Sequence, residues 1–226
     1  GAASATLRVP PGTPLAGYAE QTGYTLVLAD PDVGGRYSAL SAFGLVPSAL
    51  AGADVAELLD DAAALISALA EPSDNPGLHL GALLGAAAEQ GQDKLVLAAA
   101  ETELAGLPDW IEQLVAESTG KHGRGILPVV VDGVTDPAWT GAGVDTIRVA
   151  LATGSGSGEQ PAAGADLTVT GPLGAQFLLW QYATAAAGRL LGIRPFCRPN
   201  LTESKDNSSA LLDRLAAGPP LPVGDQ

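Results

Sequence analysis

Short apolar runs alternate along this chain with longer segments of helical pattern, and this alternation constrains the fold more than any other feature. Runs such as 94–99 and 146–151 have the length of buried strands, whereas 55–70 and 172–191 have the length and end signals of helices. Strands that alternate with helices are typical of a parallel sheet, because the crossover helices pack on its faces. The sequence therefore predicts an α/β fold, a three-layer αβα sandwich with a central parallel sheet.

The expected elements follow one another without an internal repeat. Strands are expected at 5–9, 24–29, 94–99, 127–131, 146–151 and 167–169, and helices at 14–21, before 51, and at 55–70, 76–90, 108–117, 172–191 and 202–216. Asp54 is expected to cap the helix at 55–70, and Gly91 and Gly192 to end the helices before them. The Gly/Ser-rich stretch 153–165 is interpreted as a surface connection, because no helix opens directly behind it, as a phosphate-binding loop requires.

The segment DVGGRYS (32–38) follows the strand expected at 24–29 and leads into a stretch of small residues. Gly34 and Gly35 permit positive φ angles and let the backbone come close to a ligand. The apolar run before them is typical of a buried parallel strand, and ligands of open α/β sheets bind at the carboxyl ends of such strands. The sequence therefore places a cation, Arg36, where a ligand could bind.

Acidic residues outnumber basic ones and give a formal net charge of −14. This balance argues against nonspecific binding to nucleic acid or to an anionic membrane, because both need a basic surface. Much of the small set of cations falls in three short motifs, namely Arg36, Lys121, Arg124, Arg198 and Lys205. A local positive pocket in an acidic protein suits an anionic small substrate, although each cation could equally neutralise a nearby carboxylate.

Other features exclude further classes of protein. The longest apolar stretch, 173–193, contains glutamines and an arginine, so a central buried helix is expected and not a membrane span. No signal peptide is expected, because the first residues lack a basic start and a long apolar core. The single cysteine, Cys197, rules out an internal disulfide framework and fits a reducing cytoplasm. No His/Cys/carboxylate set has metal-ligand spacing, so neither a metal nor a cofactor is expected.

Two further segments carry candidate chemistry. In 111–128, Glu117 ends a helix where the chain enters a Gly-rich loop that contains Lys121, and a carboxylate at such a junction can project into a cleft as a general base. Spacing alone favours the alternative of a structural ion pair between Glu117 and Lys121. In 195–212, Lys205 lies in the first turn of an expected helix, where a cation is unfavourable against the helix dipole, and this misfit hints at a function.

Together these segments resemble the glucose-6-phosphate isomerase family. The resemblance is carried by DVGGRYSALSAFGL, AESTGKHGRGILP and PFCRPNLTESKDNSSALL, in the family's order. It implies the sugar-isomerase (SIS) fold, which is flavodoxin-like or Rossmann-like, and a sugar phosphate as substrate. It also implies roles for three residues. Glu117 would move the proton between C2 and C1, Arg36 would stabilise the enediolate, and Lys205 would assist ring opening.

The resemblance also implies substrate contacts, and here the chain departs from the family pattern. Gly34, Gly35 and Arg198 are candidate substrate contacts, with Arg198 standing where the family commonly has a glutamine. The family histidine that assists ring opening has no counterpart in VVVDGVTDPAWT. His122, close to Glu117 in the Gly-rich loop, is the candidate substitute, whereas His79 is expected on a helix surface or partly packed.

The resemblance covers the later part of the family only. Residues 1–33 would be the end of a largely missing N-terminal SIS domain, and 34–226 the C-terminal SIS domain. A homodimer is expected in the intact enzyme, and the likeness is strongest to the actinobacterial type, some members of which are fused to transaldolase. Two alternatives stay open at this point: a noncatalytic SIS domain that binds sugar phosphates in a regulatory or scaffolding role, and a flavodoxin-like fragment with no ligand.

Overall fold

The computed structural model describes residues 6–9, 12–99, 104–154, 162–197, 207–213 and 215. The chain divides into two units, 1–195 and 196–226, and each is considered by itself. In the second unit residues 207–213 are helical, within the helix expected at 202–216. The first unit holds the described strands and, of the candidate site residues, Gly34, Gly35, Arg36, Glu117 and His122.

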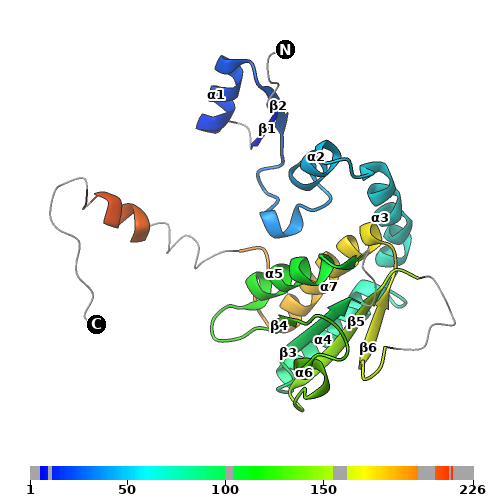
Figure 1. Cartoon of the computed structure of the whole chain (residues 1–226). Helices are drawn as coiled ribbons and strands as arrows, with labels where there is room; N and C mark the ends of the chain where they lie inside the picture. The colour runs from blue at the N-terminus through cyan, green and yellow to red at the C-terminus, as the bar shows by residue number, and fades with distance from the viewer. Residues whose placement is uncertain are drawn as a thin grey trace. The chain divides into compact units, whose positions relative to one another are not determined.

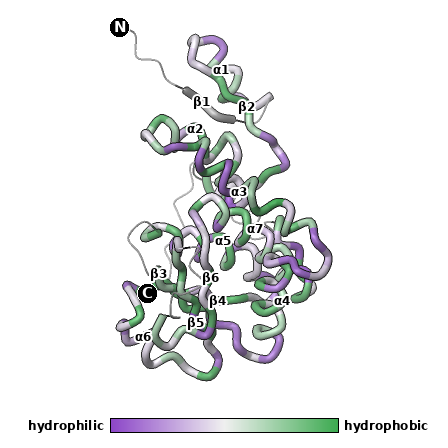
Figure 2. The backbone as a smooth tube through the Cα atoms, turned by 90° about the vertical axis from the view of Figure 1, so that its right-hand side faces the viewer, coloured by the Kyte–Doolittle hydropathy of each residue, from purple (hydrophilic) through white to green (hydrophobic). Residues whose placement is uncertain are grey.

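A parallel sheet of four strands forms the centre of the first unit (Figure 1). Its strands, in spatial order, are β4 (Leu127–Val130), β3 (Lys94–Ala99), β5 (Thr146–Ala152) and β6 (Leu167–Thr170). The two inner strands are nearly all apolar, and hydrophobic residues follow them in Figure 2. Burial on both faces favours such continuous apolar strands, as the sequence predicted.

Three helices cover one face of this sheet: α4 (Pro76–Glu89), α5 (Leu107–Thr119) and α7 (Leu173–Leu190). Their buried side chains form one core with alternate residues of β3 and β5. On the opposite face Trp139, from the short helix α6 (Pro137–Thr140), packs against Val96 and Ala150. The predicted α/β sandwich with a central parallel sheet is therefore confirmed.

Helix α4 meets α7 through a stripe of glycines spaced four residues apart, Gly77, Gly81 and Gly85. A Cβ atom added at Gly81 would lie 2.5 Å from both the Ala183 carbonyl oxygen and the Ala186 Cβ atom of α7. Side chains four apart share one face of a helix, so this face of α4 presents backbone to its neighbour. The two helices consequently pack almost backbone to backbone.

Helix α3 (Val55–Ala70) packs against α7, and α2 (Ala42–Leu50) precedes it in the chain. Asp54 caps α3 as predicted, because its Oδ1 atom accepts hydrogen bonds from the backbone N–H groups of Ala56 and Glu57. Gly91 and Gly192 have positive φ angles just after α4 and α7, as expected of helix-ending glycines. These local end signals explain why the helix bounds agree with the sequence.

Near the start of the chain, β1 (Thr6–Val9) pairs in parallel with β2 (Thr25–Leu28), and α1 (Pro14–Thr22) connects them. The expectation that β2 is buried is wrong, since Leu28 is 56% exposed. Two strands with one helix form too small a sheet to enclose a strand on both faces.

The DVGGRYS segment also differs from expectation in its backbone. Gly34 has an extended conformation with φ −68°, and neither Gly34 nor Gly35 has a positive φ angle. The segment instead forms a single 3-10 turn, η1 (Gly35–Tyr37), which is closed by the backbone hydrogen bond from Tyr37 to Gly34. The turn carries Arg36 into the interior of the fold, where this residue is buried.

Candidate active site

Arg36 and Glu117 form the centre of the candidate site. The Arg36 Nη1 atom donates to the Glu117 Oε2 atom over 3.2 Å, although the two residues are 81 positions apart in the chain. The guanidinium side chain is 3% exposed and the carboxylate side chain 44% exposed. The turn η1 thus presents a buried cation to a carboxylate that solvent can reach. In the sequence, only the family resemblance had linked these two residues.

A second side chain holds the same carboxylate. Gln113, one turn earlier on α5, donates from its Nε2 atom to the Glu117 Oε1 atom over 3.2 Å. Gln113 was not among the residues selected from the sequence, although its spacing of four residues from Glu117 places both on one face of a helix. Each oxygen of the Glu117 carboxylate therefore has a donor from the protein.

Lys121 contacts backbone and not the Glu117 carboxylate. Its ammonium group donates to the carbonyl oxygens of Glu117 and Ser118 over 3.0 and 2.7 Å, and to the Pro195 carbonyl oxygen over 3.3 Å. The residue is 6% exposed. The ion pair between Glu117 and Lys121 that spacing alone favoured is not formed, because the lysine folds back over the end of α5, where helix carbonyls lack partners.

The Pro195 carbonyl oxygen also accepts a hydrogen bond from the Arg36 Nη2 atom over 2.8 Å. This carbonyl therefore joins the two buried cations of the site. No sequence signal could have found it, because a backbone carbonyl has no residue-type signature. The Arg36 Nε atom is buried and has no hydrogen-bond partner among the described residues.

Tyr37, beside Arg36, adds a further contact to the end of α5. Its hydroxyl donates to the Ser118 Oγ atom over 3.2 Å. Burial raises the pKa of Tyr37, an effect that the hydrogen bond to Ser118 and the charge of Arg36 partly oppose. The phenol consequently stays neutral at physiological pH, and η1 and α5 are linked by neighbouring polar contacts.

His122 lies at an exposed loop tip. It forms the two-residue turn with Gly123, at φ angles of 56° and 73°, while the backbones of Lys121 and Arg124 bond to each other over 2.9 and 3.0 Å. Positive φ at both central positions is the geometry of a type I′ turn, which reverses the chain tightly. His79, the other histidine, is exposed on α4, as expected.

Of the other candidate residues selected from the sequence, the structure describes some and not others. Gly34 and Gly35 are exposed and directly precede Arg36. Arg198 and Lys205 lie outside the described residues, so their roles stay predictions. Within the described ranges no three His, Cys, Asp or Glu side chains gather in a way that could hold a metal ion. In the same ranges, none of the helices has the length and apolarity needed to cross a membrane.

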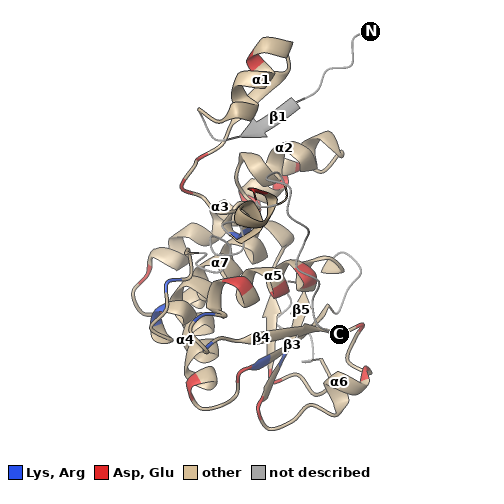
Figure 3. Cartoon of the chain, turned by 90° about the vertical axis from the view of Figure 1, so that its left-hand side faces the viewer, with Lys and Arg blue, Asp and Glu red and all other residues tan. Residues whose placement is uncertain are grey.

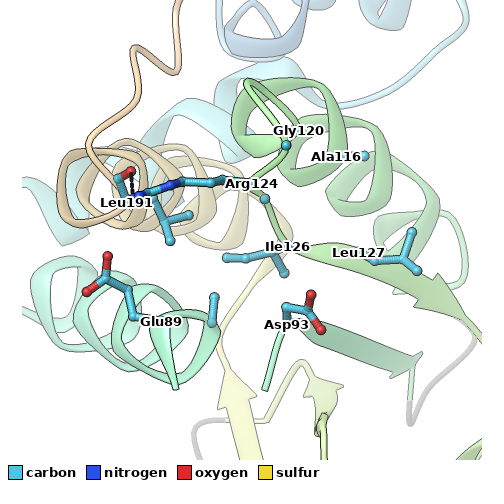
Figure 4. Close-up of a pocket in the computed structure, with 11 residues that line it drawn as sticks. Glu89, Asp93, Ala116, Gly120, Arg124, Ile126, Leu127 and Leu191 are labelled. Carbon is cyan, nitrogen blue, oxygen red and sulfur yellow. Dashed lines mark hydrogen bonds between the residues drawn. The ribbon is translucent and has the colours of Figure 1, made fainter. Parts of the chain in front are cut away.

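A groove of about 680 Å³ is lined in part by Gly120 and Arg124, at the end of α5 and in the loop that follows it (Figure 4). Arg124 extends across it toward the Leu191 carbonyl oxygen, to which its Nη1 atom donates over 3.4 Å, and Glu89 and Asp93 line the groove as well. Asp and Glu also outnumber Lys and Arg in the chain as a whole (Figure 3). Neither Arg36 nor Glu117 lines the groove. We place the candidate site at these two residues because their contact joins two distant motifs.

No protein-family model matches the chain. Curated proteins do: a glucose-6-phosphate isomerase of Symbiobacterium thermophilum is 40% identical over 120 residues, which are 52% of this chain and 27% of that protein. The enzyme of that name from Heliobacterium modesticaldum is 28% identical over 245 residues, covering 87% of this chain and 55% of the relative. The chain therefore spans about half the length, or less, of these relatives.

Solved structures show the same fold. A hypothetical protein from Thermus thermophilus superposes with a TM-score of 0.78 at 22% identity, over 92% of this chain and 62% of its own. A glucose-6-phosphate isomerase from Chlamydia trachomatis superposes with a TM-score of 0.74 at 16% identity, over 95% and 53%. The resemblance expected from the three motifs is confirmed.

Proposed function

We propose that this chain, which is related to the glucose-6-phosphate isomerases, forms the portion of such an enzyme that transfers the proton. The observation that carries the proposal is the contact between Arg36 and Glu117, which brings two of the three motifs to within 3.2 Å. The reaction would be the reversible conversion of glucose 6-phosphate into fructose 6-phosphate, catalysed by the intact protein of which the chain is a part. The chain alone would be inactive.

Interconversion of an aldose and a ketose requires a base that can take a proton from C2 and return it to C1. In the proposed mechanism the half-exposed Glu117 carboxylate is that base. Removal of the C2 proton leaves an enediolate, and the Arg36 guanidinium would stabilise its charge, since a fixed cation counts most where water is excluded. The hydroxyl proton moves from O2 to O1 of the enediolate, and protonation at C1 by Glu117 then gives the ketose and regenerates the carboxylate, so a single group serves both transfers at carbon.

Other residues have proposed roles that rest on the family resemblance. Lys205 would polarise the ring oxygen during opening, and Arg198 would contact the sugar phosphate. Gly34 and Gly35 would pass close to the substrate, and their exposure next to Arg36 supports this role. His122 would replace the missing family histidine, and its exposed place at a tight turn leaves it accessible to a substrate. No metal or redox cofactor is part of the proposal.

The test is a coupled assay of the protein at its full natural length with fructose 6-phosphate. Glu117→Gln should lower kcat roughly a thousandfold, because a positioned general base contributes on the order of 10²–10⁴ in rate. Glu112→Gln is the matched control, since Glu112 is exposed on the same helix. It should leave kcat within about twofold, because its carboxylate is outside the proposed machinery. Undiminished turnover by the Glu117 variant would refute the assignment.

A noncatalytic sugar-phosphate-binding role is the alternative. The lack of a histidine in 129–140 and the arginine at position 198, where the family commonly has a glutamine, favour it. Calorimetry with 6-phosphogluconate, beside the isomerase assay, separates the two functions. Binding without turnover supports the alternative, whereas binding with turnover supports the enzyme.

The domain and partner assignments are also proposals. Residues 1–33 would complete an N-terminal SIS domain, a proposal supported by the isolated pair of β1 and β2, by the exposed Leu28 of β2 and by the exposed Tyr18 of α1. The intact enzyme would be a cytoplasmic homodimer, with its single cysteine fitting a reducing compartment. Size measurement of the full-length protein tests the dimer directly.

A further inference from the structure

We infer that Lys121 is a positioning residue that fixes the contact between Arg36 and Glu117 through the Pro195 carbonyl group. This inference rests on the proposed function and deepens it. From the sequence, Lys121 was known only as a member of the second motif and as a possible ion-pair partner of Glu117. That ion pair does not form. The contacts of Lys121 carry it.

The place of Lys121 is unusual for a lysine. A lysine just beyond a helix normally extends its ammonium group into water. Here the chain reverses at His122 and Gly123, and the Lys121 side chain lies over the last turn of α5 with only 6% exposure. Its bonds to the Glu117 and Ser118 carbonyl oxygens satisfy acceptors that the end of the helix leaves without partners. A cation at this end is also favoured by the helix dipole.

The third acceptor links this helix end to a distant part of the chain. Pro195 is 74 residues beyond Lys121, and its carbonyl oxygen accepts from both the lysine and Arg36. Four interactions therefore close a ring: the Glu117 carboxylate with Arg36, Arg36 with the Pro195 carbonyl, that carbonyl with Lys121, and Lys121 with the Glu117 carbonyl. Both the side chain and the main chain of Glu117 belong to it.

The ring has a consequence for the proposed base. Without the ammonium group, the last turn of α5 loses its link to Pro195, while Arg36 keeps its own. The helix end would keep its contacts through Ser118 and Thr119 but lose the one to Pro195, so the Glu117 carboxylate would shift more easily. Displacement of a reacting group by about 1 Å can lower a rate on the order of a hundredfold. Lys121 itself touches neither substrate nor reacting atoms in this scheme.

The first experiment measures coupling and does not depend on activity. Arg36→Met, Lys121→Met and the double variant are unfolded with urea. If the two cations share one carbonyl, their effects on the unfolding constant are not independent. The unfolding constant of the double variant should therefore differ by at least about fivefold from the value expected if the effects of the two single variants simply multiplied. Agreement within about twofold overturns the inference. If Lys121→Met does not fold, Lys121→Gln, whose amide still donates, takes its place in the cycle.

The second experiment separates positioning from general stability in the full-length protein. Lys121→Met should lower kcat by about tenfold to a hundredfold and leave KM within about twofold. Thr119→Val is the structural control, since Thr119 anchors the same loop by accepting from the Ile126 N–H group over 2.9 Å, away from the ring. Lys94→Met controls for the lost charge at an exposed ion pair.

Each outcome of the second experiment decides between readings. A loss of kcat confined to the Lys121 variant supports positioning. Equal losses in the Lys121 and Thr119 variants show a role in stability only and overturn the inference, as does a kcat within twofold of the unmodified protein. Absence of turnover in the unmodified protein refutes the proposed function instead. The unfolding experiment alone then shows whether Arg36 and Lys121 are coupled through the Pro195 carbonyl.

Discussion

Replacement of Gly81 by alanine tests the close packing of α4 on α7. The added Cβ atom would lie 2.5 Å from the Ala183 carbonyl oxygen and 2.5 Å from the Ala186 Cβ atom, whereas real contacts of this kind are not shorter than about 3.0 Å. One of the obstructing atoms is backbone, so it cannot rotate away. The helices must therefore separate, and overpacking of this kind costs about 3 kcal/mol.

A favourable effect opposes part of this cost. Alanine is a better helix former than glycine by about 1 kcal/mol, which leaves a net destabilisation of about 2 kcal/mol. For a chain of this size the melting temperature should fall by about 4–8 °C. Gly85→Ala should cost less than Gly81→Ala, because its Cβ atom would be 3.0 Å from the Leu190 Cβ and Cδ1 atoms and 3.3 Å from the Ala187 Cα atom, so smaller shifts relieve these contacts.

Gly133→Ala is the control for the removal of a glycine as such. An added Cβ atom there meets nothing within 4 Å, and the backbone has no positive φ angle. This variant should be stabilised by about 0.4–1 kcal/mol through the unfolded chain. Thermal unfolding followed by circular dichroism measures all three variants. A Gly81 variant as stable as the unmodified chain would refute the backbone-to-backbone packing of α4 and α7.

Two further predictions concern buried and exposed polar groups. Gln176→Leu should destabilise the fold by about 3 kcal/mol, because the Trp180 indole N–H group would lose its buried acceptor and the Ala152 and Val169 carbonyl oxygens a donor. In urea unfolding, Gln181→Leu on the same helix should cost much less, since the buried Gln181 Nε2 atom has no hydrogen-bond partner among the described residues; similar losses for both would contradict this reasoning. Arg148, by its hydrogen bond, lowers the pKa of Asp166 below the ordinary value of 3.8, so this carboxylate stabilises the fold above that pH and the contribution is lost as the pH falls through the lowered pKa. Asp166→Asn should therefore reduce the loss of stability between pH 6 and pH 3, and an unchanged loss would argue against the ion pair.

The sequence predicted most of the fold because its signals are local. Asp54, Gly91 and Gly192 mark helix ends by side-chain or backbone chemistry that acts within a few residues, and the structure places them there. Helix α6 was not predicted, because its four residues are too few for a periodic pattern. The burial expected of β2 was wrong, because burial depends on neighbouring strands that a local pattern does not describe.

The candidate site was predictable in part and for a different reason. Arg36 and Glu117 were selected by motif, but only the folded chain brings them together across 81 positions. Spacing alone favoured the Glu117 carboxylate as the partner of Lys121, because spacing does not reveal that a tight turn returns the lysine side chain to backbone carbonyls. The Pro195 carbonyl could not be predicted at all, since every residue has one and only the tertiary structure selects it.

That carbonyl sets where the first unit can be cut. Helix α7, the last helix of this unit, ends at Leu190, and a truncation designed from secondary structure alone would stop there. Such a product would keep the buried Arg36 and Lys121 while it lost the oxygen that accepts from both. Expression clones of this unit should therefore extend through Pro195, because the acceptor that these cations share lies outside any helix or strand.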